Sequence, residues 1–156
     1  FDLNAPIITN TVLNTLVDCE LHTASITPSG PDELSALPAD GTYQWCMLVD
    51  VLHHADNPTA LLREAARVCS EGIVIKDHLL RGFMAGHTLR FMDRVHNARH
   101  GIALPFNYWT PDQWDEQFSL LGLKIDSRVD RLGIYPPWAD WVFGRGLHMA
   151  ARLVKV

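Results

Sequence analysis

Two apolar runs separated by one amphipathic stretch give the clearest pattern in this chain. The first covers residues 44–52, with Asp50 interrupting it near the end, and the second covers 73–75. Such runs are typical of strands that are buried on both faces of a sheet. Between them, Asn57 is a good helix N-cap and Pro58 suits the first helical position. The helix from Thr59 to about Val68 then has one apolar face, formed by Leu61, Leu62, Ala65, Ala66 and Val68. Two strands joined in this way should lie parallel, with a right-handed crossover.

The second half of the chain predicts two more helices and two more strands. The first helix is expected from Gly82 to about Asn97. Its apolar positions follow a looser period and are Phe83, Leu89, Phe91, Met92 and Val95. Residues 98–109 read as a loop. A Thr110–Gln113 capping box with proline between them starts the next helix, which stops at Gly122.

Residues 124–131 alternate like a half-exposed strand, and residues 147–156 read as the last strand. An irregular connection, 135–146, lies between these two strands. We expect them to pair antiparallel at a sheet edge.

The first 43 residues give a weaker pattern. Residues 10–16 suit a helix, a short strand end follows at Val17-Asp18, and 27–41 read as a loop. We find no repeat and no second domain, so the chain is interpreted as a single α/β domain. It divides into a weakly patterned stretch (1–43), a strand-helix-strand core (44–78) and a region with a C-terminal hairpin (79–156).

Composition narrows the function classes. Hydrophobic residues make up 47% and charged residues 20% of the 156 residues, as in an ordinary folded domain. The net charge of −5 argues against nucleic-acid binding. Cys19, Cys46 and Cys69 cannot all pair, which favours reduced thiols and a cytoplasmic location. No apolar run reaches the ~18 residues that span a bilayer and no signal peptide is recognisable, so no membrane partner is expected.

Polar residues gather where the two predicted parallel strands end. Asp50 and His53-His54 follow the first strand, and Lys76-Asp77-His78 end the second. In open α/β sheets, ligands bind outside the carboxyl ends of the strands. Any one of these residues could simply be an ordinary polar residue at the start of a loop. Two clusters on adjacent strand ends favour a ligand site.

At this point the chain resembles a known family. The run from Leu37-Pro38 through Asp40-Gly41 to Val51-Leu52-His53-His54 is similar to a segment of class I S-adenosylmethionine-dependent methyltransferases of the type-11 group. The similarity continues through Asn57-Pro58 to Val68, then 73–78, 90–93 and 103–110. It covers about residues 30–156. It implies a Rossmann-like, three-layer, mostly parallel sheet of seven strands whose last strand is antiparallel, and methyl transfer from S-adenosyl-L-methionine to a small-molecule acceptor.

The resemblance also implies roles for single residues. Leu52 and His53 would flank the methionine half of the cofactor, and Asp50 would also bind the cofactor. His54 would face the acceptor as general base, since imidazole titrates near neutrality, although a loop histidine bonded to backbone is an equal alternative. Asp77 and His78 would line the acceptor side. Asn107, Tyr108 and Trp109 would close the substrate pocket, unless the two aromatic rings serve packing.

The adenosine half of the predicted cofactor site departs from the family pattern. Glu33 stands where the family has an aspartate that contacts adenine, and Asp32 beside it is a possible substitute. Asp18 is a candidate for the acidic residue that binds the ribose, with a surface aspartate as the alternative. The glycine-rich turn and first strand should precede Asp18, yet the first glycine is Gly30.

Two readings explain the missing turn: an N-terminally truncated fragment, or a degenerate domain that never binds cofactor. For the fragment reading we predict weak or no binding of S-adenosylmethionine, little activity of this chain alone, and a strand with a glycine-rich motif encoded upstream.

Two other function classes stay open. A non-catalytic methyltransferase-like binding module would show no methyl transfer. A metal enzyme is suggested by eight histidines, but His96 and His100 lack the glutamate of an H-E-x-x-H motif. His53 and His54 should point apart on a strand-like backbone. We therefore expect no metal site.

Overall fold

The computed structural model describes residues 38–97 and 104–156, and its sheet begins with the predicted strand-helix-strand unit. Strands β1 (Tyr43–Val49) and β2 (Cys69–His78) are parallel, with Cys46 opposite Ile73 and Val49 opposite Lys76. Helix α2 (Pro58–Val68) joins them. The Asn57 side chain accepts a hydrogen bond from the Ala60 N–H at 3.0 Å, so the predicted cap is confirmed.

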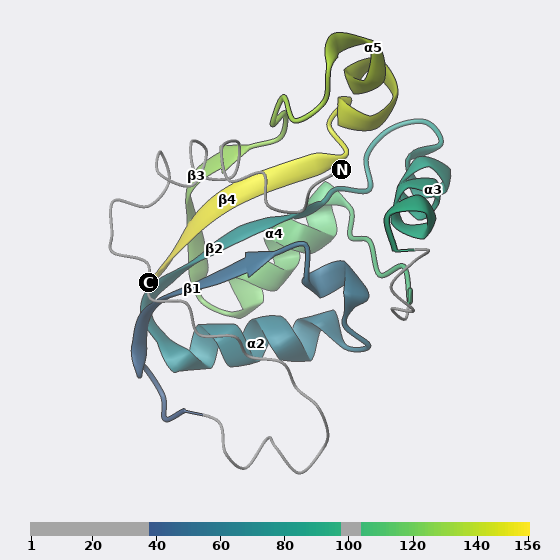
Figure 1. The fold of residues 1–156 in the computed structure, drawn as a ribbon. Coiled ribbons are helices and arrows are strands. Elements are labelled where there is room, and N and C mark those ends of the chain that lie inside the picture. Colours follow the sequence, from purple (N-terminus) through teal and green to yellow (C-terminus); the bar gives the residue numbers. More distant parts are fainter. Residues whose placement is uncertain (1–37, 98–103) are drawn as a thin grey trace.

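The predicted C-terminal hairpin is also confirmed. Strand β4 (His148–Lys155) is antiparallel to both β2 and β3 (Leu123–Val129), which gives the order β1-β2-β4-β3 (Figure 1). Helix α4 (Pro111–Leu120) precedes β3, and both halves of its Thr110–Gln113 capping box are formed. The chain therefore has the predicted α/β architecture with a mixed sheet.

The main core lies between one face of the sheet and helices α2 and α4. Its members are buried apolar side chains of β2, β4 and the two helices, including Leu62, Ile73, Ile75, Trp114, Phe118, Met149 and Leu153. The predicted face of α2 supplies Leu62, Ala65, Ala66 and Val68 as buried residues and Leu61 as a half-buried one. This core fixes the strand ends from which the site is built.

Helix α3 differs most from its prediction. It spans Ala85–Asn97, beginning three residues later than expected. Of the predicted apolar positions, Phe83, Phe91 and Val95 are exposed. The buried stripe instead follows a four-residue spacing through Ala85, Leu89, Asp93 and Asn97. The hydrophobicity pattern failed because half of this buried stripe is polar.

Two further predictions are corrected. The first strand ends at Val49, and Leu52–His54 form a 3₁₀ turn (η2) rather than strand. β1 is not buried on both faces, since Met47 is exposed. Within the described residues, β1 is also an edge strand, paired only with β2. The connection 135–146 is also not wholly irregular, because it contains helix α5 (Pro137–Ala139) and a π-helical turn η3 (Asp140–Gly144).

The predicted helix at 10–16, the strand end at Asp18 and the loop before residue 38 lie outside the described residues. In the ranges that are described, no helix combines the length and the apolar character needed to cross a bilayer.

Candidate functional site

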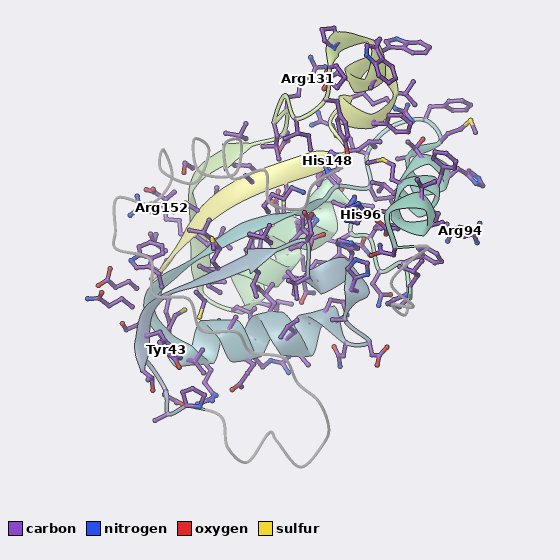
Figure 2. All side chains as sticks on the ribbon, viewed as in Figure 1. Tyr43, Arg94, His96, Arg131, His148 and Arg152 are labelled. Atoms are coloured by element: carbon purple, nitrogen blue, oxygen red, sulfur yellow. The ribbon has the colours of Figure 1, made fainter. Side chains whose placement is uncertain are left out.

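The candidate site lies at the carboxyl ends of β1 and β2. Helices α3 and α5 lie beyond this end of the sheet (Figure 1). Figure 2 shows His148 at the same end, whereas Tyr43 and Arg152 lie toward the opposite one. Because β1 and β2 are parallel, the segments 50–54 and 76–78 emerge together. The sequence predicted this juxtaposition.

Asp77 lies at the centre of the site, and its side chain is only 1% exposed. Its Oδ2 accepts a hydrogen bond from the Leu52 N–H at 3.0 Å, and its Oδ1 accepts one from the His78 N–H at 2.6 Å. His53 Nδ1 lies 2.6 Å from the same Oδ1. Burial alone raises the pKa of Asp77, but the hydrogen bonds from His53 and His78 outweigh it and hold the pKa well below its usual range. Asp77 therefore pins the 3₁₀ turn to the end of β2 as a buried carboxylate.

His53 lies between the carboxylates of Asp77 and Asp93. It is 2% exposed, with Nδ1 against Asp77 and Nε2 3.8 Å from Asp93 Oδ1. Nε2 is buried and has no hydrogen-bond partner among the described residues. Burial lowers the pKa of His53, yet the hydrogen bond and charge of Asp77, with the charge of Asp93, raise it above its ordinary value.

Asp93 is a site residue that the sequence analysis missed. It is 5% exposed, and its carboxylate accepts a short hydrogen bond from the Tyr108 hydroxyl. His78 Nε2 lies 3.7 Å from its Oδ1. Burial and the bond to Asp93 both raise the pKa of Tyr108, so the phenol keeps its proton. The available signal was the four-residue spacing from Ala85 through Leu89, which puts Asp93 on the buried side of α3.

His54 is half-buried and adjoins the cluster. Its ring centroid lies 4.0 Å from that of His53, so the prediction that the two rings point apart is wrong. The 3₁₀ turn brings them together, whereas a strand would have alternated them. Burial and the neighbouring charge of His53 lower the pKa of His54 below its ordinary value. His54 Nδ1 has no hydrogen-bond partner in the described part of the chain.

The remaining predicted residues divide between the site and its supports. Tyr108 belongs to the cluster, as described above. Asn107 fixes the backbone instead: its side chain donates to the Ala55 carbonyl at 2.8 Å, and its N–H donates to the His53 carbonyl at 3.3 Å. Trp109 packs edge-on against Trp114 at 4.7 Å between ring centroids, next to the core.

Asp50 pairs with the Lys76 ammonium and adopts a positive φ of 53°. Asp18, Asp32 and Glu33 lie outside the described residues.

His148 is the second residue that the sequence analysis missed. It starts β4 directly opposite His78, and the two ring centroids are 5.0 Å apart. Its Nε2 lies 3.3 Å from the Tyr135 hydroxyl. Burial, followed by the charges of His78 and Lys76, lowers the pKa of His148 to about 3. No local pattern indicated it, because its place depends on the β2–β4 register.

Comparisons with known proteins identify the fold of this arrangement. No family model and no curated protein sequence matches the chain. Solved structures do. An S-adenosylmethionine dependent methyltransferase from Mesorhizobium loti gives a TM-score of 0.54 at 12% identity, over 76% of this chain and 64% of that one. A candidate sarcosine dimethylglycine methyltransferase from Galdieria sulphuraria gives 0.52 at 15% identity, over 78% and 56%.

A candidate methyltransferase from Bacillus halodurans gives a TM-score of 0.50 at 15% identity, over 75% of this chain and 71% of that one. The chain thus spans between about half and three quarters of these structures. It has the Rossmann-like fold of class I methyltransferases, as the resemblance in its sequence predicted. At these identities the likeness establishes the fold alone.

Proposed function

We propose that this chain takes part in methyl transfer from S-adenosyl-L-methionine to a small-molecule acceptor. One observation carries the proposal. Two buried carboxylates, Asp77 and Asp93, and three histidine rings converge at the carboxyl ends of parallel strands. This is the place where open α/β sheets bind ligands, and buried titratable clusters gather at functional sites.

The described residues fit the methionine half of this cofactor. Asp50 and Lys76 present one carboxylate and one ammonium at the strand ends, and both are partly accessible. These two charges complement the ammonium and carboxylate of an amino-acid ligand. Leu52 and His53 would flank the same half, as the resemblance implies. When bound, the cofactor supplies a sulfonium-activated methyl group, and the negative charge of the nearby carboxylates favours its positive centre.

His54 is the proposed general base. Burial lowers its pKa, so its ring is neutral at pH 7, and the side chain as a whole is only half-buried. It can therefore accept a proton from an acceptor hydroxyl or amine. Asp77 and His78 would line the acceptor side, next to Tyr108, whose ring centroid lies 5.7 Å from that of His78. Asn107 and Trp109 hold the backbone that carries Tyr108, and thus act as positioning residues in this proposal.

The test uses the natural gene product. Calorimetry with S-adenosylhomocysteine measures cofactor binding. Incubation with S-adenosylmethionine labelled in the methyl group, together with small metabolites extracted from the source cells, detects a labelled product. We expect His54→Gln to reduce labelling by ~10²-fold or more while retaining cofactor binding. His87→Gln, on the exposed face of α3, is the matched control.

The outcomes separate the alternatives. No binding of S-adenosylhomocysteine would refute the proposal. Cofactor binding without any labelled product would favour the non-catalytic binding module. Full labelling by His54→Gln would refute the assignment of the base while leaving methyl transfer in place.

A further inference from the structure

We propose that the histidine–aspartate cluster is a binding site for a divalent transition-metal ion, with His53 Nδ1, His78 Nδ1 and Asp77 Oδ1 as ligands. These three residues, together with Asp50, place donor atoms within 4.8 Å of one another. The proposal reverses the expectation of no metal drawn from the sequence. That expectation considered His96 with His100 and His53 with His54, whereas these ligands come from the ends of two adjacent strands. It stands independently of methyl transfer.

The separations of the three donor atoms suit one shared ion. The two Nδ1 atoms are 3.2 Å apart, and they lie 2.6 Å (His53) and 3.5 Å (His78) from Asp77 Oδ1. A circle through the three donor atoms has a radius of about 1.8 Å. This radius is shorter than metal–ligand bonds of ~2.0–2.2 Å, so the three atoms are close enough together to bind one ion. An ion about 1 Å above their plane therefore reaches all three at normal bond lengths. Three protein ligands on one side leave coordination positions open, as in catalytic metal sites.

The surroundings complete the coordination chemistry. Metal-bound imidazoles usually direct their other nitrogen at a carboxylate. Here both Nε2 atoms face one carboxylate oxygen, Asp93 Oδ1, at 3.8 Å for His53 and 3.7 Å for His78. The Tyr108 hydroxyl holds the other oxygen of Asp93. Asp77 keeps its hydrogen bonds from the Leu52 and His78 N–H groups, so binding a metal costs it only the contact with a ring proton.

Charge balance supports the same assignment. Asp77 and Asp93 are both buried, and within the described ranges neither forms an ion pair with lysine or arginine. Buried carboxylates need compensating charge. A dication among the three donor atoms would supply this charge and neutralise both carboxylates. Asp50 is held by Lys76 and remains outside the set of direct ligands.

The donor set indicates the class of metal. Two imidazoles and one carboxylate suit first-row transition ions such as Zn²⁺, Co²⁺ or Fe²⁺, whereas Mg²⁺ and Ca²⁺ prefer oxygen-only sites. An ion held by three protein ligands would have a further coordination position for an oxygen, nitrogen or sulfur atom of a ligand. It would hold that atom in its deprotonated form.

The experiment titrates the tag-free gene product, stripped of metal with a chelator, with Co²⁺ and records its visible absorption bands. Zn²⁺ is then added in competition. We expect a stoichiometry of one and displacement of Co²⁺ by Zn²⁺. His53→Ala and His78→Ala should each weaken Co²⁺ binding at least a hundredfold, and Tyr108→Phe, which alters only the support of Asp93, about tenfold. His87→Ala and His96→Ala, both exposed on α3, are the matched controls and should bind Co²⁺ normally.

Circular dichroism and urea midpoints of the metal-free variants establish that they fold. If either ligand variant unfolds, Asp93→Asn serves in its place, because it keeps the shape of the side chain and should weaken binding about tenfold. Absence of Co²⁺ bands, or binding that the folded ligand variants leave unchanged, would overturn the metal site. Neither result bears on cofactor binding, which is measured separately.

Discussion

Gly72 should not tolerate even one added methyl group, because it lies in β2 against the backbone of β4 and the Trp45 side chain of β1. A Cβ atom at this position would lie 2.1 Å from the Leu153 carbonyl oxygen and 2.5 Å from the Trp45 ring. The ring can shift, but the carbonyl belongs to the β4 backbone. Gly72→Ala must therefore push β2 and β4 apart by about 1 Å at the Gly72–Val154 pair of the ladder.

The cost follows from this displacement. Overpacking a tight site costs ~1–3 kcal/mol, and loss of one strained ladder hydrogen bond adds ~1 kcal/mol. We expect the free energy of unfolding to fall by about 3 kcal/mol. With a urea slope of ~2 kcal/mol/M, the midpoint falls by about 1.5 M. Tryptophan fluorescence, which reports on Trp45 beside the mutation, and circular dichroism should give the same midpoint.

Gly86→Ala is the matched control for this substitution. Gly86 lies in α3, and the added Cβ would make only an ordinary contact, at 3.5 Å from Leu80. The helix should gain up to ~1 kcal/mol. A Gly72→Ala protein within ~0.5 kcal/mol of the wild type would contradict the register of β2 against β4, and with it the placement of His148 opposite His78.

Three further predictions concern the site and its supports. Tyr108→Phe removes the hydroxyl that donates to Asp93. It should lower the free energy of unfolding, measured in urea, by about 2 kcal/mol, because a buried carboxylate loses a charge-assisted hydrogen bond. An unchanged urea midpoint would show that this hydrogen bond is absent. Burial lowers the pKa of His148 in the folded chain to about 3, from an ordinary value of 6.5. As the pH falls below about 6.5, the unfolded chain therefore binds a proton at this histidine that the folded chain does not bind, and stability is lost. His148→Gln should therefore reduce the stability lost between pH 7 and pH 5 by about 2 kcal/mol, and an identical pH profile would refute the buried neutral histidine. Thr110→Ala removes the N-cap of α4 and should lower stability by about 1 kcal/mol, whereas Thr110→Ser, which keeps the oxygen, should leave the urea midpoint nearly unchanged.

Elements with local signals were predictable from the sequence. The β1-α2-β2 unit was recognisable because Asn57 and Pro58 mark the helix start and continuous apolar runs mark the strands. The Thr110–Gln113 capping box identified α4 in the same way. The clustering of Asp77 and His78 with the 50–54 segment followed from parallel strands ending at a common edge.

Features that depend on tertiary contacts were not predictable. Asp93 had only the four-residue spacing from Ala85 as a signal, because charged side chains are rarely buried and its neighbours Tyr108, His53 and His78 come from other parts of the chain. The 3₁₀ turn that brings the rings of His53 and His54 together depends on the Leu52 N–H reaching Asp77, 25 residues away. His148 lies in the site only because β4 pairs with β2 in the register that puts it opposite His78.

The order of the strands has a consequence for synthesis of the protein. β4 follows β3 in the chain but is inserted between β2 and β3, so it is the last of the described elements to leave the ribosome. Until then, the N–H and C=O groups of β2 from Gly72 to His78 have no partner on that side. An unpaired strand edge of this kind is a template for wrong pairing. The nascent chain should therefore bind ribosome-associated chaperones until β4 has left the ribosome. The histidine cluster should be complete only after β4 has paired with β2.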